Sequence, residues 1–215
     1  MISDFNQIEV LLEEIDRSLK KEVHLFMIGG GVLLYHGMKP ATKDIDLIVE
    51  DRREFKELER ALKDIGFESR IPTIEYRHMK LNQILVRRDF RIDLFHKAVC
   101  KGFSLSEGMA KRSEHTHSLS NLKLSLCSNE DIFLLKTMTE REGDLEDCIS
   151  LAKRGLDWKA MLRELNHQIQ ATGNKVWITW VGERLDILEG RGLTIPIMPE
   201  VNKLREEYFK CLGKA

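Results

Sequence analysis

The residues of this chain best suited to chemistry are two aspartates separated by one apolar residue, Asp44-Ile45-Asp46. Ile45, Leu47 and Val49 alternate with other residues, which predicts a strand with one buried face. Residues two apart on a strand share a face, so Asp44 and Asp46 point the same way. Neighbouring carboxylates repel each other, and a bound cation would relieve that repulsion. Their oxygen atoms suit Mg²⁺ or Mn²⁺, which bind through carboxylates and substrate phosphates.

A third acid, Asp93, lies in a second stretch with the same alternation. Ile92 and Leu94 would point to one face of a strand, and Asp93 to the other. Asp93 alone carries little information, but it gives the chain a third strand carboxylate. The expected metal ligands are therefore Asp44, Asp46 and Asp93.

A glycine run supplies the other half of the pattern. Val23 to Ile28 reads as a buried strand, Gly29 and Gly30 follow it directly, and Val32 to His36 looks like the start of a helix. Such a turn exposes backbone N–H groups to an anion, and glycine lets the backbone approach a phosphate closely. The run has neither the Lys-Ser/Thr ending of a Walker A loop nor the spacing G-x-G-x-x-G.

Each element has a simpler interpretation when taken alone. A Gly-Gly pair is commonly just a turn, and an Asp-x-Asp pair is commonly a solvated strand edge. Their order and their placement on strands favour a joint role, which is a site for a metal-bound nucleoside triphosphate. A glycosyltransferase of the Asp-x-Asp type is a weaker alternative, because it leaves the glycine turn and Asp93 unexplained.

The pattern resembles the DNA polymerase β-like nucleotidyltransferase superfamily. That signature is an apolar residue, Gly-Gly or Gly-Ser, a spacer of about a dozen residues, and Asp-apolar-Asp/Glu-apolar. Here it reads Ile28-Gly29-Gly30, then residues 31–43, then Asp44-Ile45-Asp46-Leu47. Asp93 would be the third strand carboxylate of the superfamily. Thr42 looks like the small polar residue that many members carry before the acidic pair.

A second resemblance lies further along the chain. Lys136, Arg141, Asp144 and Asp147 look like the Lys…Arg…Asp-x-x-Asp element of the AbiEii-type group, which includes toxins of toxin–antitoxin pairs. The alternative is a surface helix with scattered charges. The two resemblances together cover roughly residues 20–155.

These resemblances imply transfer of a nucleoside monophosphate from an NTP to an acceptor, with pyrophosphate leaving. The implied catalytic residues are the three strand acids together with Lys136 and Asp144. The implied nucleotide-binding residues are Gly29, Gly30, Thr42 and Lys136. The resemblance gives Lys136 the role of neutralising charge on the triphosphate or acceptor, and Asp144 that of orienting it.

The acceptor stays open at this stage. An RNA end, most of all tRNA, is the first hypothesis, with an antitoxin protein as a further partner. Transfer to a small-molecule or protein hydroxyl is the second hypothesis, and a non-catalytic NTP- or RNA-binding module is the third. Residues 77–117 contain nine Lys and Arg against four acids, and such a basic stretch could follow a phosphate backbone or simply form a solvated face.

Composition agrees with a globular protein. The chain has 215 residues with 42% apolar and 32% charged residues, and its net charge of −1 gives no global attraction to nucleic acid. We expect no membrane span and no signal peptide. The four cysteines form no C-x-x-C pair, which favours reduced thiols and a cytoplasmic location.

The coarse pattern predicts an α+β fold, in which a small mixed sheet with flanking helices forms a nucleotidyltransferase core. We place that core at residues 1–127 and a helical C-terminal region, packed on it, at residues 128–215. Residues 118–126 alternate and are predicted as one strand. Gly143 is predicted to break a helix.

Overall fold

The computed structural model describes residues 1–71 and 81–213, which divide into two compact units. The first unit is Met1–Ser128 and the second is Asn129–Ala215. The first unit contains the sheet, and the second is helical. The predicted α+β class is confirmed.

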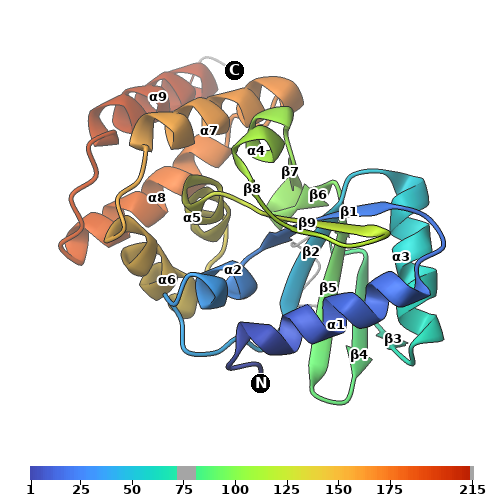
Figure 1. The fold of residues 1–215 in the computed structure, drawn as a ribbon. Coiled ribbons are helices and arrows are strands. Elements are labelled where there is room, and N and C mark those ends of the chain that lie inside the picture. The colour runs from blue at the N-terminus through green and yellow to red at the C-terminus, as the bar shows by residue number, and fades with distance from the viewer. Residues whose placement is uncertain (72–80, 214–215) are drawn as a thin grey trace. The chain divides into compact units, whose positions relative to one another are not determined.

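The sheet of the first unit has seven strands in the order β3-β4-β5-β2-β1-β9-β8. It is mixed, because β2 runs parallel to β5 and β1 parallel to β9, whereas the other neighbours are antiparallel. Segments far apart in sequence therefore lie side by side, as Figure 1 shows for the blue strand β1 and the yellow-green strand β9. The strands are β1 (Val23–Ile28), β2 (Ile45–Val49), β3 (Glu68–Arg70), β4 (Gln83–Arg87), β5 (Phe90–His96), β8 (Glu114–Ser118) and β9 (Leu122–Leu126), and a separate pair is β6 (Ala98–Val99) and β7 (Phe103–Ser104).

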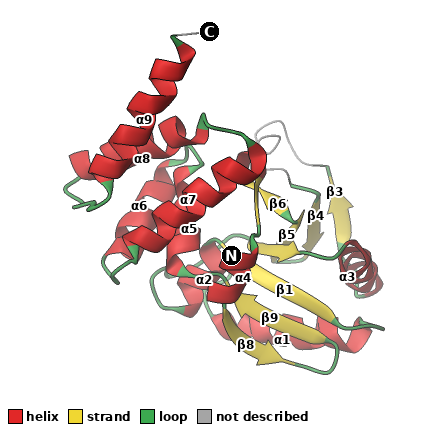
Figure 2. Cartoon of the chain, turned by 90° about the horizontal axis from the view of Figure 1, so that it is seen from above, coloured by secondary structure: helices red, strands yellow, loops and turns green. Residues whose placement is uncertain are grey.

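Two amphipathic helices cover one face of this sheet (Figure 2). Helix α1 (Phe5–Ser18) is capped by the Asp4 carboxylate, which accepts from the Asn6 N–H, and it buries an apolar stripe at helical spacing. Helix α3 (Arg52–Asp64) is capped by Asp51 and ends before Gly66, whose φ of +88° suits glycine. The shorter helices of this unit are α2 (Gly30–Tyr35), α4 (Glu107–Arg112) and the 3-10 helix η2 (Cys100–Gly102).

Helices α6, α7 and α8 of the second unit pack against α5, and α9 packs against α8. Trp177 and Phe133 are among its largest buried side chains, and the rings of Phe133 and Trp158 meet in a T-shaped arrangement. The helices are α5 (Asn129–Thr137), α6 (Glu142–Ala152), α7 (Trp158–Thr172), α8 (Trp177–Gly190) and α9 (Met198–Leu212). Among the described residues, no helix is long and apolar enough to cross a membrane.

Two local predictions are wrong. Residues 118–126 are not one strand, because β8 ends at Ser118 and β9 begins at Leu122 with a tight connection between them. Gly143 does not break a helix but lies in the first turn of α6, and the break falls just before Glu142. Glycine near a helix end costs less than in the middle, because fewer backbone hydrogen bonds depend on it.

Leu47→Ala should test the position of β2. Leu47 is 1% exposed, and Val10, on α1, is 64% exposed. We expect Leu47→Ala to lower the free energy of unfolding by about 2–5 kcal/mol because it opens a cavity, and the Val10→Ala control to change it little. Urea unfolding measures both values. Equal small effects would contradict the buried position of this strand.

Candidate active site

The parallel pairing of two strands brings acids from distant parts of the sequence together. Asp46 on β2 lies opposite Asp93 on β5 in register, and it lies opposite Ile28 on β1. Paired residues of adjacent strands point to the same face, so the two carboxylates are neighbours. Asp44 directly precedes β2, and both it and Asp46 are half-buried, whereas Asp93 is 1% exposed. The structure thus assembles Asp46 and Asp93, with Asp44 two residues before Asp46.

The glycine turn packs directly against this acidic group. Gly29 has a φ of +68°, and a Cβ atom placed there would overlap the Asp46 carboxylate. A Cβ atom at Gly30 would likewise overlap the Thr42 hydroxyl. Both positions therefore need glycine, one for conformation and space and the other for space alone. The turn, the acid and the threonine form one contact group, although the sequence predicted them only as separate motifs.

Thr42 fixes the segment that leads into the acids. Its hydroxyl donates to the Asp44 carbonyl at 3.0 Å. Its backbone exchanges two hydrogen bonds with Ile2, each of 2.8 Å, which makes an isolated antiparallel bridge. Thr42 is buried, so its hydroxyl is an internal support for the Asp44 segment. Its predicted part in nucleotide binding stays a prediction.

Arg91 is the site residue that the sequence interpretation missed. Its Nε donates to Asp93 Oδ1 at 2.7 Å, and its Nη2 donates to Oδ2 at 2.8 Å. This two-pronged pair is the strongest arrangement of a guanidinium with a carboxylate. The signal was present in the sequence, because residues 91 and 93 of one strand share a face. Arg91 had been counted only as part of a basic stretch.

The carboxylates of Asp44, Asp46 and Asp93 are suitable ligands for a divalent cation, but Asp93 is already paired with another residue. Among the described residues, no three His, Cys, Asp or Glu side chains form a group that could hold a metal ion. Asp93 is instead paired with Arg91 through both oxygens. Mg²⁺ needs only one or two carboxylates when phosphates complete its coordination, so Asp44 and Asp46 fit such an ion.

The second unit contains a buried ionic cluster. Lys136 on α5 donates to Asp144 at 2.8 Å and to Asp147 at 2.7 Å, and both acids lie on α6. Thr139 and Arg141 donate to the other oxygen of Asp144. Lys136 and Asp144, both predicted as site residues, contact each other, and their part in an active site stays a prediction. Asp147 bonds to Lys136 equally directly, a contact that the sequence left unassigned.

Electrostatics keeps this cluster charged. Burial alone would raise the pKa of Asp144, but Lys136 and Arg141 outweigh it and lower the pKa to about 2. Burial alone would lower the pKa of Lys136, but Asp144 and Asp147 outweigh it and raise the pKa. A lysine held protonated in this way is unsuited to act as a base. In this arrangement Lys136 joins α5 to α6.

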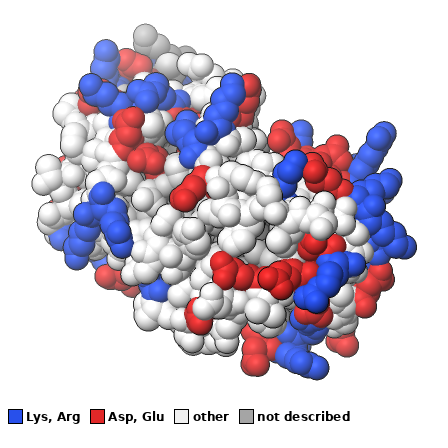
Figure 3. All heavy atoms as spheres, viewed as in Figure 1, with Lys and Arg blue, Asp and Glu red and all other residues white. Residues whose placement is uncertain are grey.

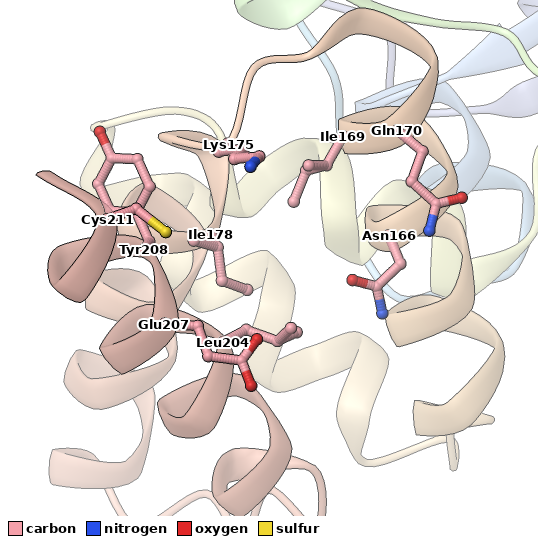
Figure 4. A pocket seen from close by; sticks show the side chains of 9 residues that line it. All are labelled: Asn166, Ile169, Gln170, Lys175, Ile178, Leu204, Glu207, Tyr208 and Cys211. Carbon is pink, nitrogen blue, oxygen red and sulfur yellow. The ribbon is translucent and has the colours of Figure 1, made fainter. Parts of the chain in front are cut away.

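The second unit also has a cavity of about 240 Å³ between α7, α8 and α9 (Figure 4). Ile169, Ile178 and Leu204 form its apolar lining, and Lys175 and Glu207 contribute opposite charges. None of the predicted site residues lines it.

Gly30→Ala should destabilise the first unit, whereas Gly143→Ala should stabilise the second. The new methyl group at residue 30 would collide with the Thr42 side chain, and overpacking of this kind costs about 1–3 kcal/mol. At residue 143 a methyl group meets nothing within 4 Å, and alanine is favoured over glycine by at most the about 0.5–1 kcal/mol of a mid-helix position, because residue 143 lies in the first turn. Denaturant unfolding measures both. Equal effects of the two changes would contradict the close contact at Gly30.

Acid should weaken the Asp144 cluster in a defined pH range. The pKa of Asp144 is depressed in the folded state, so its contribution is fully present above about pH 4. The contribution is lost as the pH falls toward 2, and it amounts to about 2 kcal/mol. Urea unfolding at pH 7 and pH 3 should show the stability difference between wild type and Asp144→Asn shrinking at the lower pH. Exposed Glu146 supplies the control Glu146→Gln, and a pH-independent difference for Asp144→Asn would contradict this account.

Comparison with solved structures shows the same fold in the antibiotic-resistance factor ANT(2″)-Ia. A crystal structure of ANT(2″)-Ia in complex with adenylyl-2″-tobramycin matches with a TM-score of 0.51 and 13% identity, over 77% of this chain and 99% of that one. A solution structure of antibiotic-resistance factor ANT(2″)-Ia matches with a TM-score of 0.52 and 14% identity, over 79% and 93%. No curated protein sequence matches the chain.

A protein family matches most of the chain and includes every predicted site residue. The match spans residues 4–176, and the family is described as a nucleotidyltransferase of unknown function, DUF6036. It confirms the predicted superfamily, whereas the AbiEii-type resemblance of residues 136–147 stays a prediction. Because the match covers well over half of the sequence, the chain belongs to this nucleotidyltransferase family.

Proposed function

We propose that the chain transfers a nucleoside monophosphate from an NTP to an acceptor hydroxyl in a reaction that depends on Mg²⁺ or Mn²⁺. The observation that carries this proposal is the close packing of the Gly29 turn against the Asp46 carboxylate, beside Asp93 on the next strand. A glycine turn admits phosphates, and the carboxylates of Asp44 and Asp46 suit the cation that accompanies them. Family membership supplies the reaction class.

Each residue then has a separate role. Asp44 and Asp46 would hold the cation, which when bound neutralises phosphate charge and stabilises the attacking and leaving oxygens. Gly29 and Gly30 leave room beside Asp46 and Thr42 for a close backbone approach. Thr42 fixes the backbone before Asp44 through its hydroxyl. Asp93 would complete the metal site and help to deprotonate the attacking hydroxyl once its oxygens are released from Arg91.

The helical unit would contribute through its ionic cluster. Lys136 and Asp144 keep their proposed part in the active site, with Lys136 as the positive charge that faces the triphosphate or the acceptor. In the structure Lys136 is held by two carboxylates, so such a contact requires it to exchange one of these partners. Arg141 is the more exposed cation of the cluster, at 58% exposure, and could face a phosphate without leaving Asp144.

Charge pairing favours a small-molecule acceptor over RNA. In the basic stretch, Arg87 pairs with Glu14, Arg91 with Asp93 and Lys111 with Glu107, which neutralises part of its positive charge. Arg77 and Lys80 of this stretch lie outside the described residues. On the face seen in Figure 3, positive and negative side chains are interspersed. The likeness in fold to ANT(2″)-Ia, which was solved in complex with adenylyl-2″-tobramycin, supports a hydroxylated small molecule.

An RNA end is the second candidate acceptor, with the chain as the toxin of a toxin–antitoxin pair in the cytoplasm. The AbiEii-type element at Lys136 and Asp144 favours it. This candidate requires salt-sensitive binding of RNA. It also requires that the wild-type chain arrest growth on expression and that a site variant not do so.

Asp46→Asn should abolish nucleotidyl transfer while the protein stays folded. The purified protein is incubated with Mg²⁺, each α-³²P-NTP, and either total cellular RNA or a panel of hydroxylated small molecules that includes aminoglycosides. Wild type should label one acceptor class, and Asp46→Asn should lower the rate at least about 100-fold because several kcal/mol of charge stabilisation are lost. Chelation of the metal should have the same effect.

Asp89→Asn is the matched control, because Asp89 is an exposed acid at the turn between β4 and β5. It should leave transfer unchanged. Label on a discrete RNA would select the second candidate acceptor. Wild-type turnover in Asp46→Asn would overturn the assignment of the site.

A further inference from the structure

The third acid of the site carries its own positive partner. Arg91 occupies both oxygens of Asp93, at 2.7 and 2.8 Å, from two residues earlier on the same strand. Asp93 is 1% exposed, and the Arg91 side chain is 27% exposed. The carboxylate is therefore buried beneath the guanidinium, which itself reaches solvent. A cation approaching Asp93 meets a positive charge that is already bound there.

Arg91 has a clear physical reason to be where it is. Asp46 is the in-register neighbour of Asp93, so two carboxylates lie side by side on adjacent strands. The other neighbour of Asp93, Ile84 on β4, is apolar and offers no compensating charge. An ionised carboxylate that is buried in this way needs a bound cation or a fixed donor pair. Arg91 meets that need from within the chain.

We propose that Arg91 is an internal counter-ion that competes with the divalent metal for Asp93. In the nucleotide-free protein the metal is then held by Asp44 and Asp46, and Asp93 joins the metal site only when Arg91 gives it up. The triphosphate offers Arg91 another partner in place of Asp93, because a guanidinium pairs as well with phosphate as with carboxylate. Arg91 is thus a positioning residue that delays assembly of the full acidic site until nucleotide is bound. This inference rests on the function proposed above.

Removal of Arg91 should strengthen metal binding in the absence of nucleotide. For Arg91→Gln we expect at least about tenfold tighter binding of Mn²⁺, measured by calorimetry, because a nearby positive charge no longer repels the ion. The rise in melting temperature on adding Mg²⁺ should also be larger than in wild type, since the metal replaces the lost counter-ion. The gain should vanish in Arg91→Gln/Asp93→Asn, which lacks the acid in question.

Arg87→Gln is the matched control. Arg87 lies on the neighbouring strand β4 and makes the same two-pronged pair with Glu14, at 2.6 and 2.7 Å, so its loss changes charge without touching Asp93. It should leave Mn²⁺ affinity unchanged. If Arg91→Gln does not fold without metal, Arg91→Lys provides the measurement. The single ammonium group of lysine competes with the metal for Asp93 less well than the two-pronged guanidinium of arginine. This variant should show a smaller gain in affinity.

Two outcomes separate this inference from the proposed function. Unchanged Mn²⁺ affinity in folded Arg91 variants, with normal metal-dependent transfer in wild type, would overturn the role of Arg91 alone. Absence of both metal–NTP binding and transfer in wild type would overturn the proposed function, and the inference with it.

Discussion

Repulsion between neighbouring carboxylates is the constraint on which the sheet unit depends. The parallel pairing of β2 with β5 sets Asp46 beside Asp93, and this pairing is also the centre of the sheet. Repulsion there would favour separation of the two strands unless positive charge or hydrogen bonds offset it. Apolar residues on the opposite face, among them Leu47 and Leu94, hold the strands together. The core thus imposes a local charge arrangement that is unfavourable by itself.

The helical unit also contains two neighbouring carboxylates, and there a buried lysine offsets their repulsion. There a single lysine lies between Asp144 and Asp147, and Arg141 and Thr139 complete the bonds of Asp144. Lys136 is deeply buried, whereas Arg91 of the sheet unit is partly open to solvent. The helical cluster is suited to fix two helices to each other. The pair of Arg91 and Asp93 in the sheet unit is better suited to exchange partners, because water and ligands can reach the guanidinium of Arg91.

Much of the fold could be predicted from periodicity, and the site only in part. The strands that contain Asp46 and Asp93 were predicted because their apolar residues alternate, and the glycine turn because it directly follows a buried strand. The β8–β9 hairpin was missed because β8 is largely polar, with residues such as Glu114 and His115, so its alternation gives no hydrophobic signal. Strand order could not be predicted either, since pairing between distant segments leaves no local pattern.

The sequence predicted which residues belong to the site better than it predicted the contacts among them. The overlap of a Gly29 side chain with Asp46 depends on how closely a turn approaches the next strand, which no spacing rule gives. The pair of Arg91 with Asp93 follows from strand geometry, but a basic residue near an acidic site also suits phosphate binding. Only coordinates distinguish the two. The sequence left the same two interpretations open for Lys136, which could pair with a phosphate or with nearby acids.

The bridge between Ile2 and Thr42 has a practical consequence for work with this protein. Residue 2 is buried and shares two backbone hydrogen bonds with the segment that leads into Asp44, so the start of the described chain supports the acidic site. Affinity tags or fluorescent labels joined to the exposed Met1 would follow directly on this bridge, so any disturbance they cause would fall on the segment that leads into Asp44.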